Sequence, residues 1–236
     1  MLPGKKAIFE NRRDAGKKLA ERLSAYKGSG TLVLGIPNGG LPLGMEVALA
    51  LEADLDLIVS RKIPIPLRPE VGCGAVTDDG TVILNSEMMQ KFNLTQETVS
   101  EQVAKVTANI RQRMLVYRGN RPPSIIANKV VIIVDDGLAS GFTMMAAVES
   151  VRRRRPRFLI VAVPAASEAA LCQLNKYADK VIALATSNAK EFYLADFYEV
   201  WHDLNEDEAL RCLEEYRVRR MNPDIGNIRI PRVPNR

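Results

Sequence analysis

One segment of the chain, residues 130–143, constrains the fold more than any other. Its sequence is VVIIVDDGLASGFT: five aliphatic residues, two adjacent carboxylates, a loop of small residues, and a helical pattern that begins near Thr143. An aliphatic run rich in Val and Ile is typical of a strand buried on both faces of a parallel sheet. Open sheets of this class bind ligands at the carboxyl ends of their strands. The segment therefore predicts an α/β protein with a binding site just after Val134.

The loop after this strand carries the groups that bind a sugar phosphate. Consecutive backbone N–H groups, the hydroxyls of Ser140 and Thr143 and a helix N-terminus suit a phosphate. The carboxylates of Asp135 and Asp136 would repel a phosphate unless they meet hydroxyl groups or a metal ion. We therefore expect a sugar phosphate with a vicinal diol. A buried strand that ends in an ordinary acidic turn is the alternative.

The same segment resembles the ribose-phosphate loop of type I phosphoribosyltransferases: a hydrophobic strand, two acidic residues, three variable residues, Thr-Gly, one residue and Thr. The resemblance implies binding of 5-phosphoribosyl-1-pyrophosphate (PRPP), with Asp135 and Asp136 on the ribose hydroxyls and residues 139–143 around the 5-phosphate. Ser140 replaces the usual Thr and keeps a hydroxyl donor. Mg²⁺ is implied as well, held by the acidic pair indirectly, through PRPP or water. The residues so assigned are Asp135, Asp136, Gly137, Ala139, Ser140, Gly141 and Thr143.

A second strand–loop–helix unit covers residues 32–51. Gly39 and Gly40 would let the backbone approach a charged ligand closely, although Pro-x-Gly-Gly also occurs in ordinary turns. In the resembled family this position holds the pyrophosphate loop, which often contains a cis peptide. The resemblance therefore assigns pyrophosphate binding to Pro37, Asn38, Gly39 and Gly40. Many relatives have a basic residue in place of Asn38, so the donor role would pass to Asn38 and the backbone.

Arg61 and Lys62 follow the next expected strand, residues 55–60. Such a pair recurs in the family, and two cations there would neutralise pyrophosphate as it leaves. We predict a catalytic role for both, against the alternative of two solvated charges at a strand end. The family's oxopurine-specific branch has an aspartate as general base at the position of Ala139. An oxopurine acceptor is therefore less favoured.

A closer resemblance, to a group of bacterial predicted phosphoribosyltransferases, extends from about Phe9 to Tyr216. It is carried by residues 11–16, 37–42, 61–62, 70–75, 117–122 and 135–143. That group implies a scaffold and a donor substrate but no acceptor. Two features could form the acceptor side. Phe192 and Tyr193 could stack on a base or fill a core. A basic face with Lys105, Arg111 and Arg118 could meet an anionic acceptor, another subunit or only solvent.

The fold class that follows is α/β, with a central, mostly parallel sheet and flanking helices. We expect one domain over residues 1–221, with a small hood from the N-terminus and residues 180–205. A helical insertion is expected over residues 86–118. Three prolines in residues 63–69 predict an extended loop without regular structure. Residues 222–236, rich in Pro and Arg, predict a basic arm or a disordered tail.

Composition narrows the setting. The 236 residues are 47% hydrophobic and carry a net charge of +5, which fits an anionic substrate but also nucleic acid. The most basic run, residues 152–157, is expected to be a solvated helix end, with a nucleic-acid patch as the alternative. Three scattered cysteines predict neither a disulfide framework nor a zinc site. No signal peptide or membrane span is recognisable, so we expect a cytoplasmic protein, and the family resemblance implies a homo-oligomer.

Three functions are consistent with these patterns. The favoured one is a Mg²⁺- and PRPP-dependent phosphoribosyltransferase that acts on a nitrogenous acceptor. The second is a PRPP-sensing regulator of the same fold that binds nucleic acid. The third is a hydrolytic or phosphorolytic reaction at the same donor loop. Retention of the residues at 37–40 and 61–62 favours a catalyst.

Overall fold

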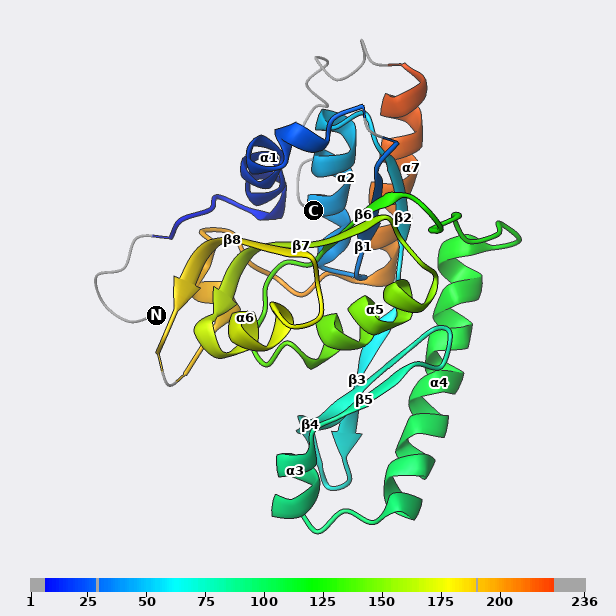
Figure 1. Ribbon diagram of the computed structural model, residues 1–236, viewed down its shortest axis with the longest axis vertical. Helices are drawn as coiled ribbons and strands as arrows, with labels where there is room; N and C mark the ends of the chain where they lie inside the picture. Colours follow the sequence, from blue (N-terminus) through cyan, green and yellow to red (C-terminus); the bar gives the residue numbers. More distant parts are fainter. Residues whose placement is uncertain (1–6, 29, 190, 223–236) are drawn as a thin grey trace, which may run out of the picture.

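A five-stranded parallel sheet forms the centre of the computed structural model, which describes residues 7–28, 30–189 and 191–222 (Figure 1). The strands are β1 Leu32–Gly35, β2 Asp54–Leu57, β6 Val130–Val134, β7 Phe158–Ser167 and β8 Lys180–Ser187, in the order β2-β1-β6-β7-β8. Every pair within this sheet is parallel. The predicted α/β class with a central parallel sheet is therefore confirmed. The predicted arm, apart from Asn222, lies outside the described residues, as do residues 1–6.

Two helical layers cover this sheet (Figure 1). On one face lie α1 Arg12–Arg22, α2 Gly40–Ala50 and α7 Glu206–Met221, and on the other lie α5 Phe142–Arg153 and α6 Glu168–Leu174. The aliphatic run of strand β6 packs against both helical layers. Val130, Ile132 and Val134 face the first layer, and Val131 and Ile133 face the second. Burial on both faces removes every side chain of β6 from water and fixes the strand that carries the acidic pair.

The segment between β2 and β6 forms a projection beside the main sheet (Figure 1). It contains a three-stranded antiparallel sheet, β3 Ser60–Ile65, β4 Arg68–Thr77 and β5 Val82–Leu84. Two helices follow, α3 Ser86–Lys91 and α4 Gln96–Arg118, which confirms the expected helical insertion. Thr95 caps α4 as its position suggests, because its side chain accepts a hydrogen bond from the Thr98 N–H.

The proline-rich segment 63–69 corrects an expectation, because it is regular structure. It forms the end of β3, a tight turn and the start of β4. Strand β3 is an edge strand, so the missing N–H of Pro64 breaks no central pairing. The register shifts at Pro64, from Ile65 opposite Arg68 to Pro64 opposite Gly72, and the bulge takes up Pro69. The preceding strand is also shorter than expected, so the Arg61-Lys62 pair lies within β3 and not after β2.

The N-terminal segment and residues 194–201 pack together beside the sheet edge, where the hood was expected. Phe9 forms a parallel bridge with Tyr198, and the N–H groups of Ile8 and Phe9 donate to the Phe197 carbonyl. Tyr198 and Phe9 are buried in the same core layer as α1 and α2. A short 3-10 helix, Leu194–Phe197, precedes this contact, and another, Ser24–Tyr26, follows α1.

The basic run at the end of α5 is a helix end with paired charges. Arg152 binds Asp179, Arg153 binds Glu149 and Arg154 binds Asp79. These ion pairs leave less free charge for nucleic acid. Across the described part of the chain, no helix is both long enough and apolar enough to cross a bilayer.

Candidate functional site

A cavity of about 610 Å³ brings together side chains from the three segments that the sequence singles out. Its lining includes Pro37 after β1, Arg61 and Lys62 from β3, and Asp135 and Thr143 from the loop after β6. Strands β1 and β6 are neighbours in the sheet, with Gly35 opposite Val134, so their carboxyl ends meet at this edge. The antiparallel sheet brings Arg61 and Lys62 to the same place. The remaining lining residues are Ile36, Ser60, Pro64, Pro69, Gln102, Lys105, Val106 and Asn109.

The two carboxylates of the acidic pair face different surroundings. Asp135 lines the cavity, and its Oδ1 accepts a hydrogen bond from the Asp136 N–H at 2.9 Å. Asp136 instead forms an ion pair with Arg12, at 2.8 Å from Nε to Oδ2. Burial, and then the neighbouring charge of Asp136, raise the pKa of Asp135 well above its usual value. Burial also raises the pKa of Asp136, and Arg12 opposes that rise.

The loop from Gly137 to Gly141 is held against the end of β7. The Leu138 N–H donates to the Ala165 carbonyl at 2.9 Å, and the Ser167 N–H donates to the Leu138 carbonyl at 2.9 Å. The Ser167 hydroxyl donates to the Ala139 carbonyl at 2.7 Å. The Ala139 and Ser140 side chains are exposed. Gly141 begins α5 with φ at 78°, a conformation that favours glycine, and no side chain caps the helix. The first N–H groups of α5 therefore have no side-chain acceptor among the described residues.

The loop of Pro37 to Gly40 is packed directly against the acidic loop. The peptide bond between Pro37 and Asn38 is cis, as the family resemblance implies. A Cβ on Gly39 would collide with the Asp136 carboxylate, and a Cβ on Gly40 would lie 2.5 Å from the Val134 carbonyl oxygen. At Gly40 the obstacle is backbone, so only glycine fits, whereas at Gly39 a Cβ would have to displace the carboxylate oxygen that binds Arg12. This close approach joins the two loops into one surface.

The Asn38 side chain is already engaged at both ends of its amide. Its Nδ2 donates to the Leu204 carbonyl, and its Oδ1 accepts from the Tyr117 hydroxyl. The family resemblance predicts that Asn38 and the loop backbone donate hydrogen bonds to pyrophosphate. With both ends of its amide occupied by protein groups, Asn38 links this loop to Leu204 and to Tyr117 of α4.

Arg61 and Lys62 differ in how free their charges are. Among the described residues, the Arg61 guanidinium makes no hydrogen bond or ion pair. Burial and then the nearby charge of Arg113 lower the pKa of Arg61, so an anion beside it would relieve both effects. Lys62 is exposed, and its Nζ donates to the Glu70 carbonyl at 2.7 Å.

The aromatic residues near 192–201 divide into a buried and an exposed group. Tyr198 packs on Phe9 and Trp201, with ring centroids 5.4 and 5.0 Å away. These rings fill a core. Tyr193 is 59% exposed and bonds Glu191, while Phe192 is half-buried against Phe197. Phe192 and Tyr193, with the half-buried Phe197 and Trp201, have surface to offer a ligand, and none of the four lines the cavity.

Sequence reasoning missed two contributions to this site. Gln102 and Asn109 line the cavity beside Lys105, which the sequence places on a basic face of this helix, and the helical spacing of the three was the available signal. Arg12 binds Asp136 from 124 residues away in the chain, and no local pattern indicates that contact. The proposed basic face of α4 is wrong for Arg118, which turns inward to an ion pair with Asp56 at 2.8 Å.

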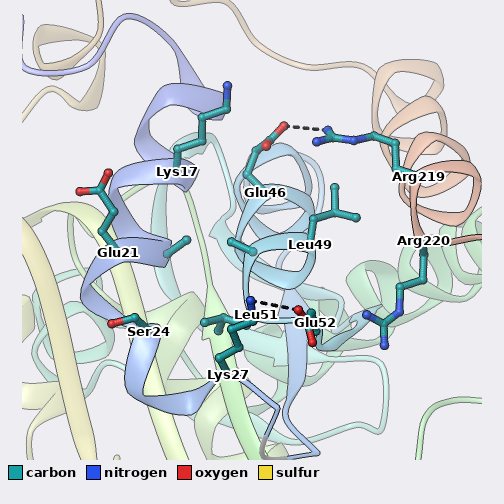
Figure 2. A pocket seen from close by; sticks show the side chains of 12 residues that line it. Lys17, Glu21, Ser24, Lys27, Glu46, Leu49, Leu51, Glu52, Arg219 and Arg220 are labelled. Carbon is teal, nitrogen blue, oxygen red and sulfur yellow. Dashed lines mark hydrogen bonds and ion pairs between the residues drawn. The ribbon is translucent and has the colours of Figure 1, made fainter. Parts of the chain in front are cut away.

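A larger cavity, of about 730 Å³, lies between α1, α2 and α7 and contains none of the predicted site residues (Figure 2). Its charges are largely paired: Glu46 binds Arg219, and Lys27 binds Glu52. Cavity size alone therefore does not identify the functional site. The convergence of the predicted loops makes the 610 Å³ cavity the candidate site.

Known proteins match this chain over the residues that form the candidate site. The family described as phosphoribosyl transferase domain matches residues 5–195. Two curated proteins of Mycobacterium tuberculosis (strains CDC 1551 and H37Rv), each named "Putative phosphoribosyl transferase", are 33% identical over 207 residues. These cover 88% of this chain and 46% of each relative, so the chain spans about half the length of the curated relatives it matches. The crystal structure of TT1426 from Thermus thermophilus is 32% identical, with a TM-score of 0.73, over 88% of this chain and 98% of that one.

Proposed function

Because the chain belongs to the phosphoribosyl transferase domain family, we propose that it transfers phosphoribose from PRPP to a nitrogenous acceptor and releases pyrophosphate. The single observation that carries this proposal is the cavity in which Asp135, Thr143, Pro37, Arg61 and Lys62 converge. Thr143 at the end of the expected phosphate loop, a carboxylate and two cations in one cavity would match the three parts of PRPP: phosphate, diol and pyrophosphate.

The proposed reaction breaks the bond between the anomeric carbon and the pyrophosphate oxygen, whose electron pair leaves with pyrophosphate. A lone pair on the acceptor nitrogen forms the new bond to that carbon, and the nitrogen then loses a proton. Negative charge grows on the departing oxygens, so stabilisation there lowers the barrier. Arg61, whose guanidinium has no partner in the described part of the chain, is placed to supply it, together with Lys62. The backbone of residues 37–40 would hold the pyrophosphate before and after the bond breaks.

Mg²⁺ fits the donor set of this site only with help from the substrate. No group of three or more His, Cys, Asp or Glu that could hold a metal occurs within residues 7–28, 30–189 and 191–222. Carboxylate oxygens are ligands that Mg²⁺ accepts, and it commonly keeps waters and binds substrate phosphates. Asp135 would therefore hold it together with PRPP oxygens or through water. When bound, Mg²⁺ would neutralise the charge of the pyrophosphate group.

The acceptor side is the less defined half of the proposal. Ala139 supplies no general base, so a proton on the acceptor nitrogen must pass to solvent or to a group on the acceptor. Phe192 and Tyr193 are the proposed acceptor contacts, because both have free surface on which a base could stack. We expect the protein to act in the cytoplasm as a homo-oligomer, and light scattering measures the second point.

The test is pyrophosphate release. The full chain is incubated with PRPP, Mg²⁺ and a panel of purine, pyrimidine and other nitrogenous acceptors, and pyrophosphate and the ribosylated product are both measured. Asp135→Asn should abolish turnover, while Asp54→Asn, at the exposed start of β2 and outside the cavity lining, should not. Pyrophosphate release with every acceptor absent would indicate hydrolysis. Salt-dependent nucleic-acid binding with no pyrophosphate release would support the regulator instead.

A further inference from the structure

The Arg12 side chain is held between the acidic loop after β6 and the hood residues 201–202. Its side chain is buried, with 7% of the residue exposed. Its Nε binds Asp136 at 2.8 Å, and its Nη1 donates to the His202 carbonyl at 2.9 Å. The guanidinium lies 3.8 Å from the ring centroid of Trp201. This cation is therefore held by a carboxylate, a carbonyl and an aromatic ring together.

These contacts turn the Asp136 carboxylate out of the cavity. Asp135 lines the cavity and Asp136 does not. The Asp136 carboxylate instead lies against the backbone of Gly39, where even a Cβ would collide with it. The Asp136 carbonyl also accepts a hydrogen bond from the Tyr198 hydroxyl at 2.7 Å. Both the side chain and the backbone of Asp136 are thus used to hold neighbouring segments together.

We propose that Arg12 is a positioning residue for the donor site, and that the acidic pair is divided between two tasks. Asp135 meets the ribose hydroxyls, while Asp136, fixed by Arg12, holds the acidic loop against the pyrophosphate loop. Arg12 also neutralises one of two adjacent buried carboxylates. Without it, two negative charges would face a polyanionic substrate. This inference rests on the proposed function and assigns roles within the same site.

The chain contains a matched control and a built-in reporter. Arg13, the next residue, is also on α1 and forms an ion pair with Glu215 at 2.6 Å, away from the acidic pair. Trp201 is the only tryptophan of the chain and stacks on Arg12, so its fluorescence reports on this contact directly. Thermal unfolding of each variant separates loss of fold from loss of the site.

The experiment measures the Kd of Mg²⁺-PRPP by calorimetry and by Trp201 fluorescence for Arg12→Gln, Asp136→Asn, their double variant, Asp135→Asn and Arg13→Gln. We expect Arg12→Gln and Asp136→Asn each to weaken PRPP binding about tenfold, as removal of an outer partner of a ligand-binding group commonly does. The double variant should be no worse than either single one, because both remove one interaction. Asp135→Asn should cost more, and Arg13→Gln should lower Tm without changing the Kd.

Several outcomes would overturn the inference. Wild-type Kd in Arg12→Gln would show that the ion pair does not position the site. Losses that add in the double variant would make the two residues independent. An Asp136→Asn loss as large as that of Asp135→Asn would place Asp136 on the ligand. Asp136→Asn keeps the shape of the side chain and still tests the pair if Arg12→Gln fails to fold. A wild-type protein that binds no PRPP would overturn the proposed function as well, which distinguishes the two failures.

Discussion

The cavity has two walls that are built by different means. The loop wall, residues 37–40 and 135–143, is fixed by close approaches of its backbone: Gly39 against the Asp136 carboxylate, Gly40 against the Val134 carbonyl, and the hydrogen bonds of Leu138 to β7. The insertion wall, β3 and α4, is attached through a hydrophobic cluster that joins Ile63, Ile110 and Tyr117 to Leu41 of α2 and Leu213 of α7, and through polar side chains. Ser60 donates to the Thr143 carbonyl at 2.8 Å, and Arg113 binds Glu206 at 3.2 Å.

This difference separates what each wall can tolerate. A close approach with no room for a Cβ favours glycine, whereas a side-chain contact, apolar or polar, can be exchanged for another of similar size or reach. The loop wall would hold the part of the substrate that every family member shares. The insertion wall, where Gln102 and Lys105 line the cavity, is the part that can vary with the reaction.

Gly39→Ala is the most severe test of the contrast between the walls. Gly39 has φ −60° and ψ −36°, which alanine adopts freely, so the cost comes only from the clash with Asp136. We expect PRPP binding to weaken about a hundredfold, because small displacements of a positioned site are expensive. Calorimetric Kd measures it. Gly28→Ala is the control: its φ of +66° strains an alanine, but nothing lies within 4 Å, so stability should fall and the Kd should not. An equal loss of PRPP affinity in both variants would show that the close approach at Gly39 is not what holds the site.

Arg118→Met tests the insertion wall. Arg118 joins α4 to β2 through Asp56 at 2.8 Å and the Leu57 carbonyl at 2.8 Å. Loss of the cation leaves Asp56 partly buried with only backbone donors, which should cost about 2–3 kcal/mol of unfolding free energy. Denaturant unfolding measures that loss. Arg111→Met, at an exposed position on the same helix, should cost little. PRPP affinity should fall less than in Gly39→Ala, and a larger fall would show that the insertion organises the loops.

The two walls also differ in how far they could be predicted from the sequence. Each loop of the loop wall is local in the chain: in the second one, the strand, the acidic pair and the expected phosphate loop are consecutive residues. The insertion wall depends on tertiary placement. Arg118 has the same spacing as its exposed neighbours, and only the packing of α4 on β2 turns it inward. Pro64 predicts a break, and only its place on an edge strand makes it tolerable.

Arg12 shows the same limit at the site itself. Local patterns indicate the identity of the acidic residues but not the direction of their side chains. That direction is set by a cation 124 residues earlier in the chain and by the hood that buries it. A sequence without an alignment contains no signal for such a pair.

Arg61→Gln removes one unpaired cation of the insertion wall and separates substrate binding from the chemical step there. Arg61 has no ion-pair partner in the described structure, so its loss should leave unfolding free energy nearly unchanged. Turnover should fall about tenfold, with little change in PRPP affinity, if its charge acts chiefly on departing pyrophosphate. Steady-state kcat and the binding constant separate the two effects. A Kd loss as large as the kcat loss would show instead that Arg61 holds PRPP before the reaction.

The smallest expected effect concerns the stability of the loop wall and its dependence on pH. The fold raises the pKa of Asp135 through burial and the charge of Asp136. Between the unfolded pKa of about 3.9 and the raised folded value, the folded chain holds a proton that the unfolded chain has lost, so stability falls as pH rises through this window. Asp135→Asn removes that dependence, and its Oδ1 can still accept from the Asp136 N–H. In thermal unfolding, the Tm of Asp135→Asn should therefore match that of the wild type near pH 4 and exceed it near pH 8. Asp54→Asn is the control, because it shows how much of the difference comes from the loss of one negative charge. A variant that is less stable at both pH values would mean that the fold stabilises the charged carboxylate. The expected divergence at high pH would instead show that the loop wall keeps this carboxylate at a cost in stability, as a ligand-binding group does and a structural one does not.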